Sequence, residues 1–249
     1  MQPSGRVNFL ERFLTEKDIA VFLGLSIPDT LKQLKNSGLK TVQKQGRLVY
    51  SRSEVINWIS SDLSSLTGER LLKAEVSSGG QGGLDSEFCG ITQLLSRGGI
   101  FFPERISTRS SVFRFLAQTA CDLGAAYDSR ELREQLEERE KVVSTALKCG
   151  AALIHPLDIG KLYLEHELLA LMIPPHPVPF GEASGRLTSL FFLLLFPDPH
   201  RHVHILARLN RLLRSCEFVN NLLTAQNENE AIETFRVREL EVIGSGAGR

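Results

Sequence analysis

The stretch LEEREKVVSTALKCGAALIHP, residues 136–156, decides the fold class of the larger part of the chain. Its first half is charged and helical in pattern, and its second half holds the apolar run 151–154. A short apolar run bounded by Gly150 and Pro156 is typical of a buried strand. His155 then stands at the carboxyl end of that strand, where ligands bind in open α/β sheets.

Similar segments follow along the chain. Leu168 to Ile173 and Leu190 to Phe196 are further apolar runs bounded by Pro or Gly, and we expect both to be buried strands. Residues 112–123 and 203–214 carry apolar side chains at i, i+3, i+4 spacing, which predicts amphipathic helices. The sequence therefore predicts an α/β fold with a mixed β-sheet flanked by helices.

Residues 15–59 read TEKDIAVFLGLSIPDTLKQLKNSGLKTVQKQGRLVYSRSEVINWI. Gly24 ends a first short helix, and Ser26 with Pro28 begins a second one. Gly46 lies at the turn of a predicted hairpin, and a last helix carries Trp58. Two helices joined by a short turn are a helix-turn-helix candidate.

This order of elements resembles the small winged-helix DNA-binding domain of the excisionase and MerR type. The resemblance implies that the second helix enters the major groove and that the hairpin contacts the flanking backbone. Seven residues then become candidate DNA contacts: Thr30, Lys32 and Gln33 toward base edges, and Lys35, Lys44, Arg47 and Arg52 toward phosphates. The alternative is a helix-turn-helix that docks proteins or dimerises.

Residues 136–156 resemble the enzyme IIA domain of the phosphoenolpyruvate-dependent phosphotransferase system, in its fructose, mannitol and nitrogen-regulatory branch. Arg139-Glu140, Ser144-Thr145, Gly150, Ala152 and His155 fall in register with that family's motif, and His202 aligns with its second active-site histidine. The chain departs from the family at Ala146 and Lys148, where glycines are usual, and at Ile154, where proline is.

The resemblance implies that His155 accepts a phosphoryl group from the histidine protein HPr or a similar donor. Arg139 would supply a cation and His202 a second hydrogen-bond donor, while Thr145 and the backbone N–H groups near Gly150 would complete a cradle for the phosphoryl oxygens. Neither a metal ion nor another cofactor is required. His200, His202 and His204 alternate, and a metal-binding face is the minor alternative for them.

Composition sets outer limits on function. The 249 residues contain 29 Lys and Arg and 29 Asp and Glu, which excludes a globally basic nucleic-acid coat protein. Residues 1–60 hold nine basic and five acidic side chains, a net charge of +4, so the charge is uneven. The longest apolar run has seven residues, against about 20 for a membrane span, and the four cysteines form no CxxC pair. We therefore expect a cytoplasmic protein without a membrane-inserted segment.

Gly and Ser density places the expected boundaries. We expect a winged helix-turn-helix domain over residues 1–61, a flexible linker over 62–86, a IIA-like domain over 87–240 and a flexible tail over 241–249. The function expected from both parts is a regulatory phosphocarrier, phosphorylated on His155 and coupled to a DNA-binding module. A homodimer would read a palindrome. The alternative is a non-catalytic sensor or scaffold that acts through a protein partner.

Overall fold

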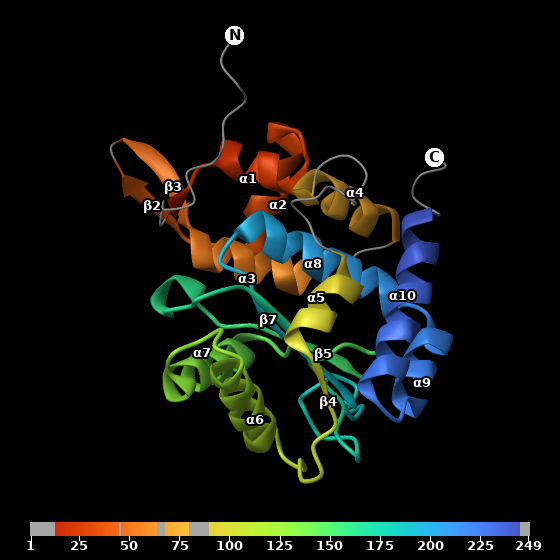
Figure 1. The fold of residues 1–249 in the computed structure, drawn as a ribbon. Helices are drawn as coiled ribbons and strands as arrows, with labels where there is room; N and C mark the ends of the chain where they lie inside the picture. The colour runs from red at the N-terminus through yellow and green to blue at the C-terminus, as the bar shows by residue number, and fades with distance from the viewer. Residues whose placement is uncertain (1–12, 45, 64–67, 80–89, 245–249) are drawn as a thin grey trace.

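A four-stranded mixed sheet forms the centre of the C-terminal domain, residues 90–244, in the computed structural model (Figure 1). The structure describes residues 13–44, 46–63, 68–79 and 90–244 of the chain. The sheet has the order β4-β6-β7-β5 and consists of β4 (Ile100–Phe101), β5 (Ala151–Ile154), β6 (Leu168–Met172) and β7 (Leu190–Leu195). The pairs β4–β6 and β5–β7 are parallel, whereas β6 and β7 are antiparallel.

Both faces of this sheet are covered by helices, because every residue of β5, β6 and β7 is apolar and buried. The helices α6 (Arg109–Asp122) and α7 (Ser129–Val142) cover one face. The opposite face packs on α5 (Ile91–Gly98), α8 (Pro199–Leu212) and α10 (Glu228–Gly244), with α9 (Cys216–Thr224) against α10. A short 3-10 helix, η1 (Ile159–Lys161), lies between β5 and β6. The predicted mixed sheet flanked by helices is confirmed.

Residues 13–79, which we call the N-terminal module, form a second group of elements. They are β1 (Phe13–Leu14), α1 (Glu16–Leu23), α2 (Ile27–Ser37), β2 (Thr41–Lys44), β3 (Arg47–Ser51), α3 (Arg52–Leu63) and α4 (Gly68–Gly79). Ser26 caps α2 by accepting a hydrogen bond from the Asp29 backbone N–H, and Gly38 ends α2 at a φ of 71°. The two short helices, the hairpin and the last helix lie where the sequence places them; their assignment as a DNA-binding winged helix stays a prediction.

The expected flexible linker over residues 62–86 is wrong for the part that the structure describes. Residues 68–79 form α4, which packs along α8, and Leu71, Ala74 and Glu75 of α4 are buried. Gly and Ser content pointed to a tether, but one face of this segment is apolar and carries a paired carboxylate, so burial favours a helix. Residues 64–67 and 80–86 lie outside the described residues. The expected tail also begins too early, because α10 continues to Gly244; residues 245–249 are outside the description.

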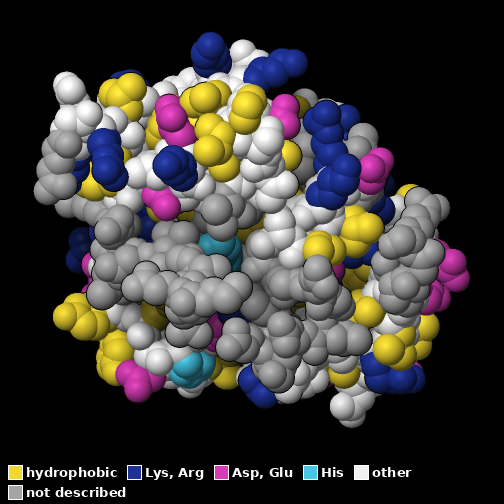
Figure 2. Space-filling model, turned by 90° about the horizontal axis from the view of Figure 1, so that it is seen from above, with side chains coloured by type: hydrophobic (Ala, Val, Ile, Leu, Met, Phe, Trp, Pro, Cys, Tyr) yellow, Lys and Arg dark blue, Asp and Glu magenta, His cyan; other side chains and the backbone are white. Residues whose placement is uncertain are grey.

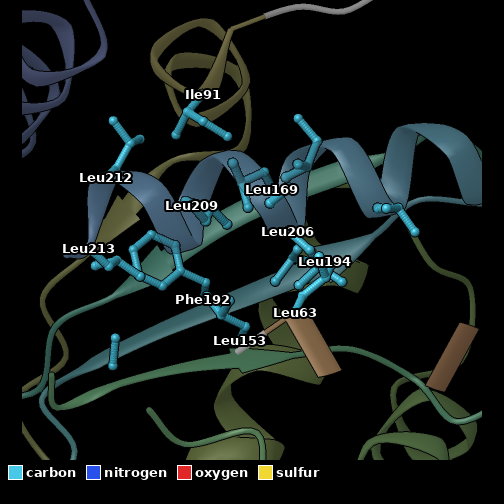
Figure 3. Close-up of a cluster of buried hydrophobic side chains, with 14 of the residues drawn as sticks. Leu63, Ile91, Leu153, Leu169, Phe192, Leu194, Leu206, Leu209, Leu212 and Leu213 are labelled. Carbon is cyan, nitrogen blue, oxygen red and sulfur yellow. The ribbon is translucent and has the colours of Figure 1, made fainter. Parts of the chain in front are cut away.

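The N-terminal module and the C-terminal domain share one hydrophobic core. Buried side chains of α3 and α4 belong to the same cluster as those of β7 and α8. Figure 3 shows Leu63 of α3 beside Leu194 of β7 and Leu206 of α8. This packing fixes α3 on the same face of the sheet as α8.

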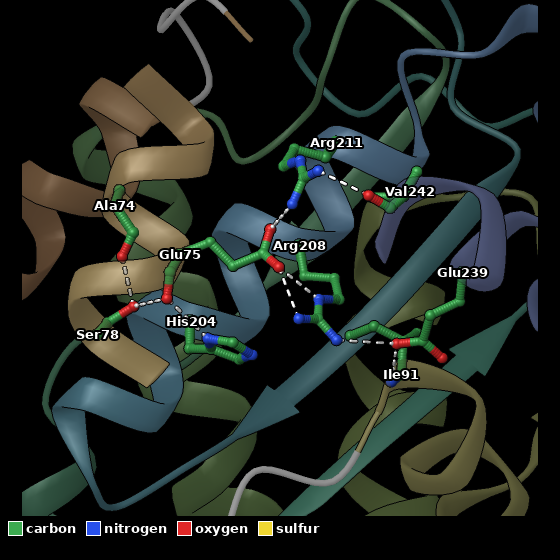
Figure 4. A network of polar contacts seen from close by, with 9 residues as sticks. All are labelled: Ala74, Glu75, Ser78, Ile91, His204, Arg208, Arg211, Glu239 and Val242. Carbon is green, nitrogen blue, oxygen red and sulfur yellow. Dashed lines mark hydrogen bonds and ion pairs between the residues drawn. The ribbon is translucent and has the colours of Figure 1, made fainter. Parts of the chain in front are cut away.

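A buried ionic network fastens α4 to the C-terminal domain (Figure 4). Glu75 of α4 lies 2.6 Å from Arg208 Nη2 and 2.5 Å from Arg211 Nη1 of α8. Arg208 also reaches Glu239 of α10 at 3.4 Å, and Glu239 accepts a hydrogen bond from the backbone N–H of Ile91 at 2.6 Å. Because removing one partner leaves a buried charge uncompensated, this network resists detachment of α4.

The helices of the structure also bear on the membrane question. None of those within the described residues has the length and apolarity that crossing a membrane requires.

Candidate active site

His155 follows β5 directly, and its ring is oriented by the strand that precedes it. The Nδ1 atom lies 2.8 Å from the carbonyl oxygen of Leu153. Because a carbonyl oxygen only accepts hydrogen bonds, Nδ1 carries the proton. The neutral ring therefore has its lone pair on Nε2, which accepts a hydrogen bond from Arg139 Nε at 3.1 Å.

The donor in this hydrogen bond, Arg139, lies in the last turn of α7. Its Nη1 donates to the carbonyl oxygen of Val143 at 2.8 Å, and its Nη2 donates to Ser61 Oγ at 3.2 Å. Burial lowers the pKa of Arg139, and the adjacent Glu140 carboxylate opposes that shift. A guanidinium with all three nitrogens engaged is a fixed, directional cation beside the His155 ring.

His202 lies in the first turn of α8, next to His155. The two ring centroids are 5.0 Å apart, with an interplanar angle of 67°. Burial and then the Arg139 charge lower the pKa of His202 to about 3, and burial, Arg139 and His202 lower the pKa of His155 well below its ordinary value. Both imidazoles are therefore neutral near pH 7, and the His155 Nε2 lone pair is engaged by the hydrogen bond from Arg139 Nε.

Thr145 and the backbone N–H of Gly150 have hydrogen-bond partners of their own. Its hydroxyl donates to Glu140 Oε2 at 2.6 Å and its backbone N–H to Glu140 Oε1 at 3.0 Å. The backbone N–H of Gly150 donates to the Leu147 carbonyl oxygen. Both donors therefore have partners within residues 140–150 in this structure. Their part in a cradle for the phosphoryl oxygens stays a prediction. Thr145 fixes Glu140, whose neighbour Arg139 touches the histidine.

Two side chains from the N-terminal module enter the site, and the sequence analysis missed both. Ser61 Oγ accepts the hydrogen bond from Arg139, and Ser60 Oγ lies 3.4 Å from His202 Nε2. Asn57 of the same helix donates to the carbonyl oxygen of Leu157 at 2.9 Å. These contacts join residues 78 to 142 positions apart, so no local pattern could have revealed them.

A cavity of about 800 Å³ lies between α3 and the C-terminal domain beside the two histidines. Its walls include Arg52 and Ile56 of the N-terminal module and Lys161, Phe196, His155 and His202 of the C-terminal domain. His155 itself is only 3% exposed. The histidine is thus reached from the interface between the two parts, not from an open surface.

Of the seven candidate DNA contacts, four are exposed, one is half-buried, and two are turned inward. Lys32, Lys35, Lys44 and Arg47 are exposed, and Gln33 is half-buried. The Lys44 ammonium also lies 3.8 Å from the centre of the Phe13 ring. Figure 2 shows the face formed by the N-terminal module, on which Lys and Arg side chains are dispersed among acidic and apolar ones.

Thr30 and Arg52 do not fit the expected DNA contacts. Thr30 is 0% exposed and donates its hydroxyl to the Ser26 carbonyl oxygen at 3.0 Å, so it cannot reach a base edge. Arg52 donates from Nη2 to the Pro197 carbonyl oxygen at 2.7 Å and faces the C-terminal domain. Both assignments failed because periodicity does not show which helix face another element covers.

His200, His202 and His204 all lie on α8 and not on a strand. The described part of the chain has no group of three or more His, Cys, Asp or Glu side chains placed to hold a metal ion.

The mixed α/β sheet, the strand-end histidine with arginine on Nε2 and the second histidine beside it together define a domain of the IIA class. The family model described as "Phosphoenolpyruvate-dependent sugar phosphotransferase system, EIIA 2" matches residues 93–237, and the chain belongs to this family. The predicted IIA resemblance is confirmed over that range. No curated protein sequence matches the chain.

Several solved structures have a similar fold. The nitrogen regulatory protein IIA-Ntr from Neisseria meningitidis is 21% identical with a TM-score of 0.51, over 58% of this chain and 98% of that one. A putative PTS IIA domain from Streptococcus pyogenes is 18% identical with a TM-score of 0.52, over 60% and 96%. A putative PTS IIA from Streptococcus mutans is 12% identical with a TM-score of 0.52, over 60% and 95%. At these identities the likeness concerns the fold.

Proposed function

We propose that His155 accepts a phosphoryl group on Nε2 from the phosphohistidine of an HPr-like donor protein. The observation that carries the proposal is the Nε2 lone pair, fixed by the Leu153 carbonyl oxygen on one side of the ring and facing Arg139 at 3.1 Å on the other. A neutral imidazole attacks phosphorus without a separate base, and a fixed guanidinium stabilises the charge on the transferred oxygens.

The transfer step balances with the groups at hand. Arg139 Nε first gives up its hydrogen bond to His155 Nε2, which frees the lone pair. That lone pair forms the new N–P bond while the donor's P–N bond breaks, and the donor imidazole leaves with the electron pair of the broken bond. The His155 proton stays on Nδ1, where the Leu153 carbonyl oxygen stabilises the positive charge that the ring gains. Arg139 and His202, which both lie beside the His155 ring, are the donors we assign to the new phosphoryl oxygens.

Incubation with phosphoenolpyruvate, enzyme I and HPr tests this proposal. The protein should gain one acid-labile, base-stable phosphate, and His155→Ala should abolish it. Arg139→Ala should slow the transfer by about 100-fold or more, since it removes a transition-state charge donor. His176→Ala is the matched control, because His176 is exposed in a loop. Undiminished labelling of His155→Ala would refute the assignment.

The N-terminal module supports a regulatory role for this phosphorylation. Exposed Lys35, Lys44 and Arg47 on the second helix and the hairpin are assigned to phosphate contacts on DNA. Exposed Lys32 and half-buried Gln33 are assigned to base edges. With Thr30 and Arg52 turned inward, fewer contacts remain per copy than the sequence suggested, so binding by a single copy should be weak and a two-fold dimer on a palindrome should bind better.

Titration of the full chain against mixed duplexes at two salt concentrations tests the DNA proposal. Arg47→Ala should weaken binding to all sequences and reduce the salt slope by about one, whereas Gln33→Ala should mainly relax sequence preference. Arg130→Ala, an exposed change on α7, is the control. Absence of binding at low salt would leave protein docking as the function of the N-terminal module.

The alternative is a non-catalytic scaffold. The observation that favours it is the burial of His155, because a protein donor cannot reach Nε2 while α3 stays in place. Failure of every variant to take phosphate from the donor cascade would favour the scaffold.

A further inference from the structure

Helix α3 of the N-terminal module presents two oxygen atoms to the site, both as acceptors. The Ser60 hydroxyl donates its proton to the Ile56 carbonyl oxygen at 2.7 Å, and the Ser61 hydroxyl donates to the Asn57 carbonyl oxygen at 2.9 Å. Since each hydroxyl has one proton, both oxygens offer only lone pairs to the site. His202 Nε2 is therefore the donor toward Ser60, as Arg139 Nη2 is toward Ser61.

These two donors are the groups that a phosphoryl group on His155 needs. A phosphoryl group carries three acceptor oxygens, and Arg139 and His202 flank the nitrogen that would hold it. We propose that Ser60 and Ser61 occupy the phosphoryl-oxygen positions, so that α3 covers the unphosphorylated site and is displaced when His155 is phosphorylated. This inference rests on the proposed function and concerns the regulation of the same site.

The part of α3 that carries Ser60 and Ser61 can move while the rest of the N-terminal module stays attached to the C-terminal domain. Near the histidines α3 contributes the small polar side chains of Ser60 and Ser61, and its N-terminal half borders the cavity of about 800 Å³ through Arg52 and Ile56. The adjoining α4 is fastened by the buried Glu75 network on α8. Val55, Ile59 and Leu63 keep α3 in the hydrophobic core that both parts of the chain share. The displacement is therefore a local shift of α3 at Ser60 and Ser61, and the helix is not detached.

Helix α3 and the phosphoryl-donor protein compete for the same surface beside His155. A donor histidine must approach His155 Nε2 from the interface side, where Ser61 and Ser60 now contact Arg139 and His202. A phosphoryl group on His155 accepts the hydrogen bonds from Arg139 and His202 that the two serines accept in the unphosphorylated protein. The inward face of α3 is then exposed at the two serines. The state of His155 is thereby transmitted to the N-terminal module.

Substitutions of opposite effect test the cover. Ser60→Ala with Ser61→Ala removes both acceptors, and this double variant should be phosphorylated about tenfold faster by the phosphoenolpyruvate, enzyme I and HPr cascade. Ser61→Asp places a carboxylate against Arg139 and should slow phosphorylation by a similar factor. Ser96→Ala is the control, because Ser96 is a helical serine that donates to the Thr92 carbonyl oxygen, outside the site.

A second readout does not depend on any donor protein. Diethyl pyrocarbonate modifies accessible neutral imidazoles, and peptide mass mapping reports the modification of His155. The double alanine variant should react faster at His155 than the wild type, with His176 as an internal reference. Hydrogen exchange of the α3 amides, residues 52–63, should rise when wild-type protein is phosphorylated and should not change in His155→Ala.

The outcomes separate the two proposals. Equal His155 reactivity toward diethyl pyrocarbonate in the wild type and the double alanine variant would overturn the cover, whatever the phosphorylation result. Faster reactivity in the double variant without phosphate incorporation in any variant would support the cover and refute phosphoryl acceptance. Faster phosphorylation of Ser61→Asp together with the alanine variant would also overturn the cover, because any change on α3 would then suffice.

Discussion

Acidification should destabilise the folded protein through His202, and the size of this effect follows from its burial. The unfolded histidine titrates at a pKa of about 6.5. In the folded protein, burial and Arg139 lower the pKa of His202 to about 3. Between these values the unfolded chain binds more protons than the folded one, so the free energy of unfolding falls as the pH falls.

The magnitude comes from the distance between the two pKa values and the working pH. A pH of about 5 lies about 1.5 units below the pKa of the unfolded histidine, which is therefore protonated, while folded His202 stays neutral. At about 1.36 kcal/mol per unit, stability falls by about 2 kcal/mol between about pH 7.5 and about pH 5 from His202 alone. The lowered pKa of His155 adds a loss of the same sign.

Urea unfolding at both pH values, followed by circular dichroism, measures this loss. His202→Gln replaces the imidazole by an amide that does not titrate, so the loss on acidification should be smaller than in the wild type by about 2 kcal/mol. His176→Gln, an exposed change, should lose as much as the wild type. Equal losses in the wild type and His202→Gln would refute the reasoning, since other groups would then account for the acid sensitivity.

Two further predictions concern the packing of the C-terminal domain and are checked by thermal unfolding. Gly98→Ala places a Cβ 2.0 Å from the Leu169 carbonyl oxygen, so backbone must shift, and we expect a loss of about 3 kcal/mol; an unchanged midpoint would contradict this close approach. Glu239→Ala removes the acceptor of the Ile91 N–H and a partner of Arg208, and should lower stability by about 2 kcal/mol. Full stability of Glu239→Ala would show that the contacts of Glu239 drawn in Figure 4 contribute nothing to stability.

Several features of this protein were determined by short stretches of sequence. The strand that ends at His155 lies within one apolar run, and Arg139 precedes it by 16 residues, in register with a family motif. The position of β6 and β7 between two layers of helices follows from their continuous apolar runs, which must be covered on both faces. Likewise, Gly38 and Ser26 mark the ends of α2 by local capping chemistry. Each of these results depends on neighbours within a few residues to about 20.

Only the tertiary structure shows which side chains are covered by other elements of the fold. Thr30 and Arg52 carry side chains suited to DNA, but contacts within α2 and with the Pro197 carbonyl oxygen turn them inward. Ser60 and Ser61 look like a polar helix end in the sequence, yet they meet Arg139 and His202 across 78 and 142 residues. Propensity and periodicity describe one segment and its own faces. The partner of each face is set by long-range packing, which is why the closed state of the His155 site could not be predicted from the sequence.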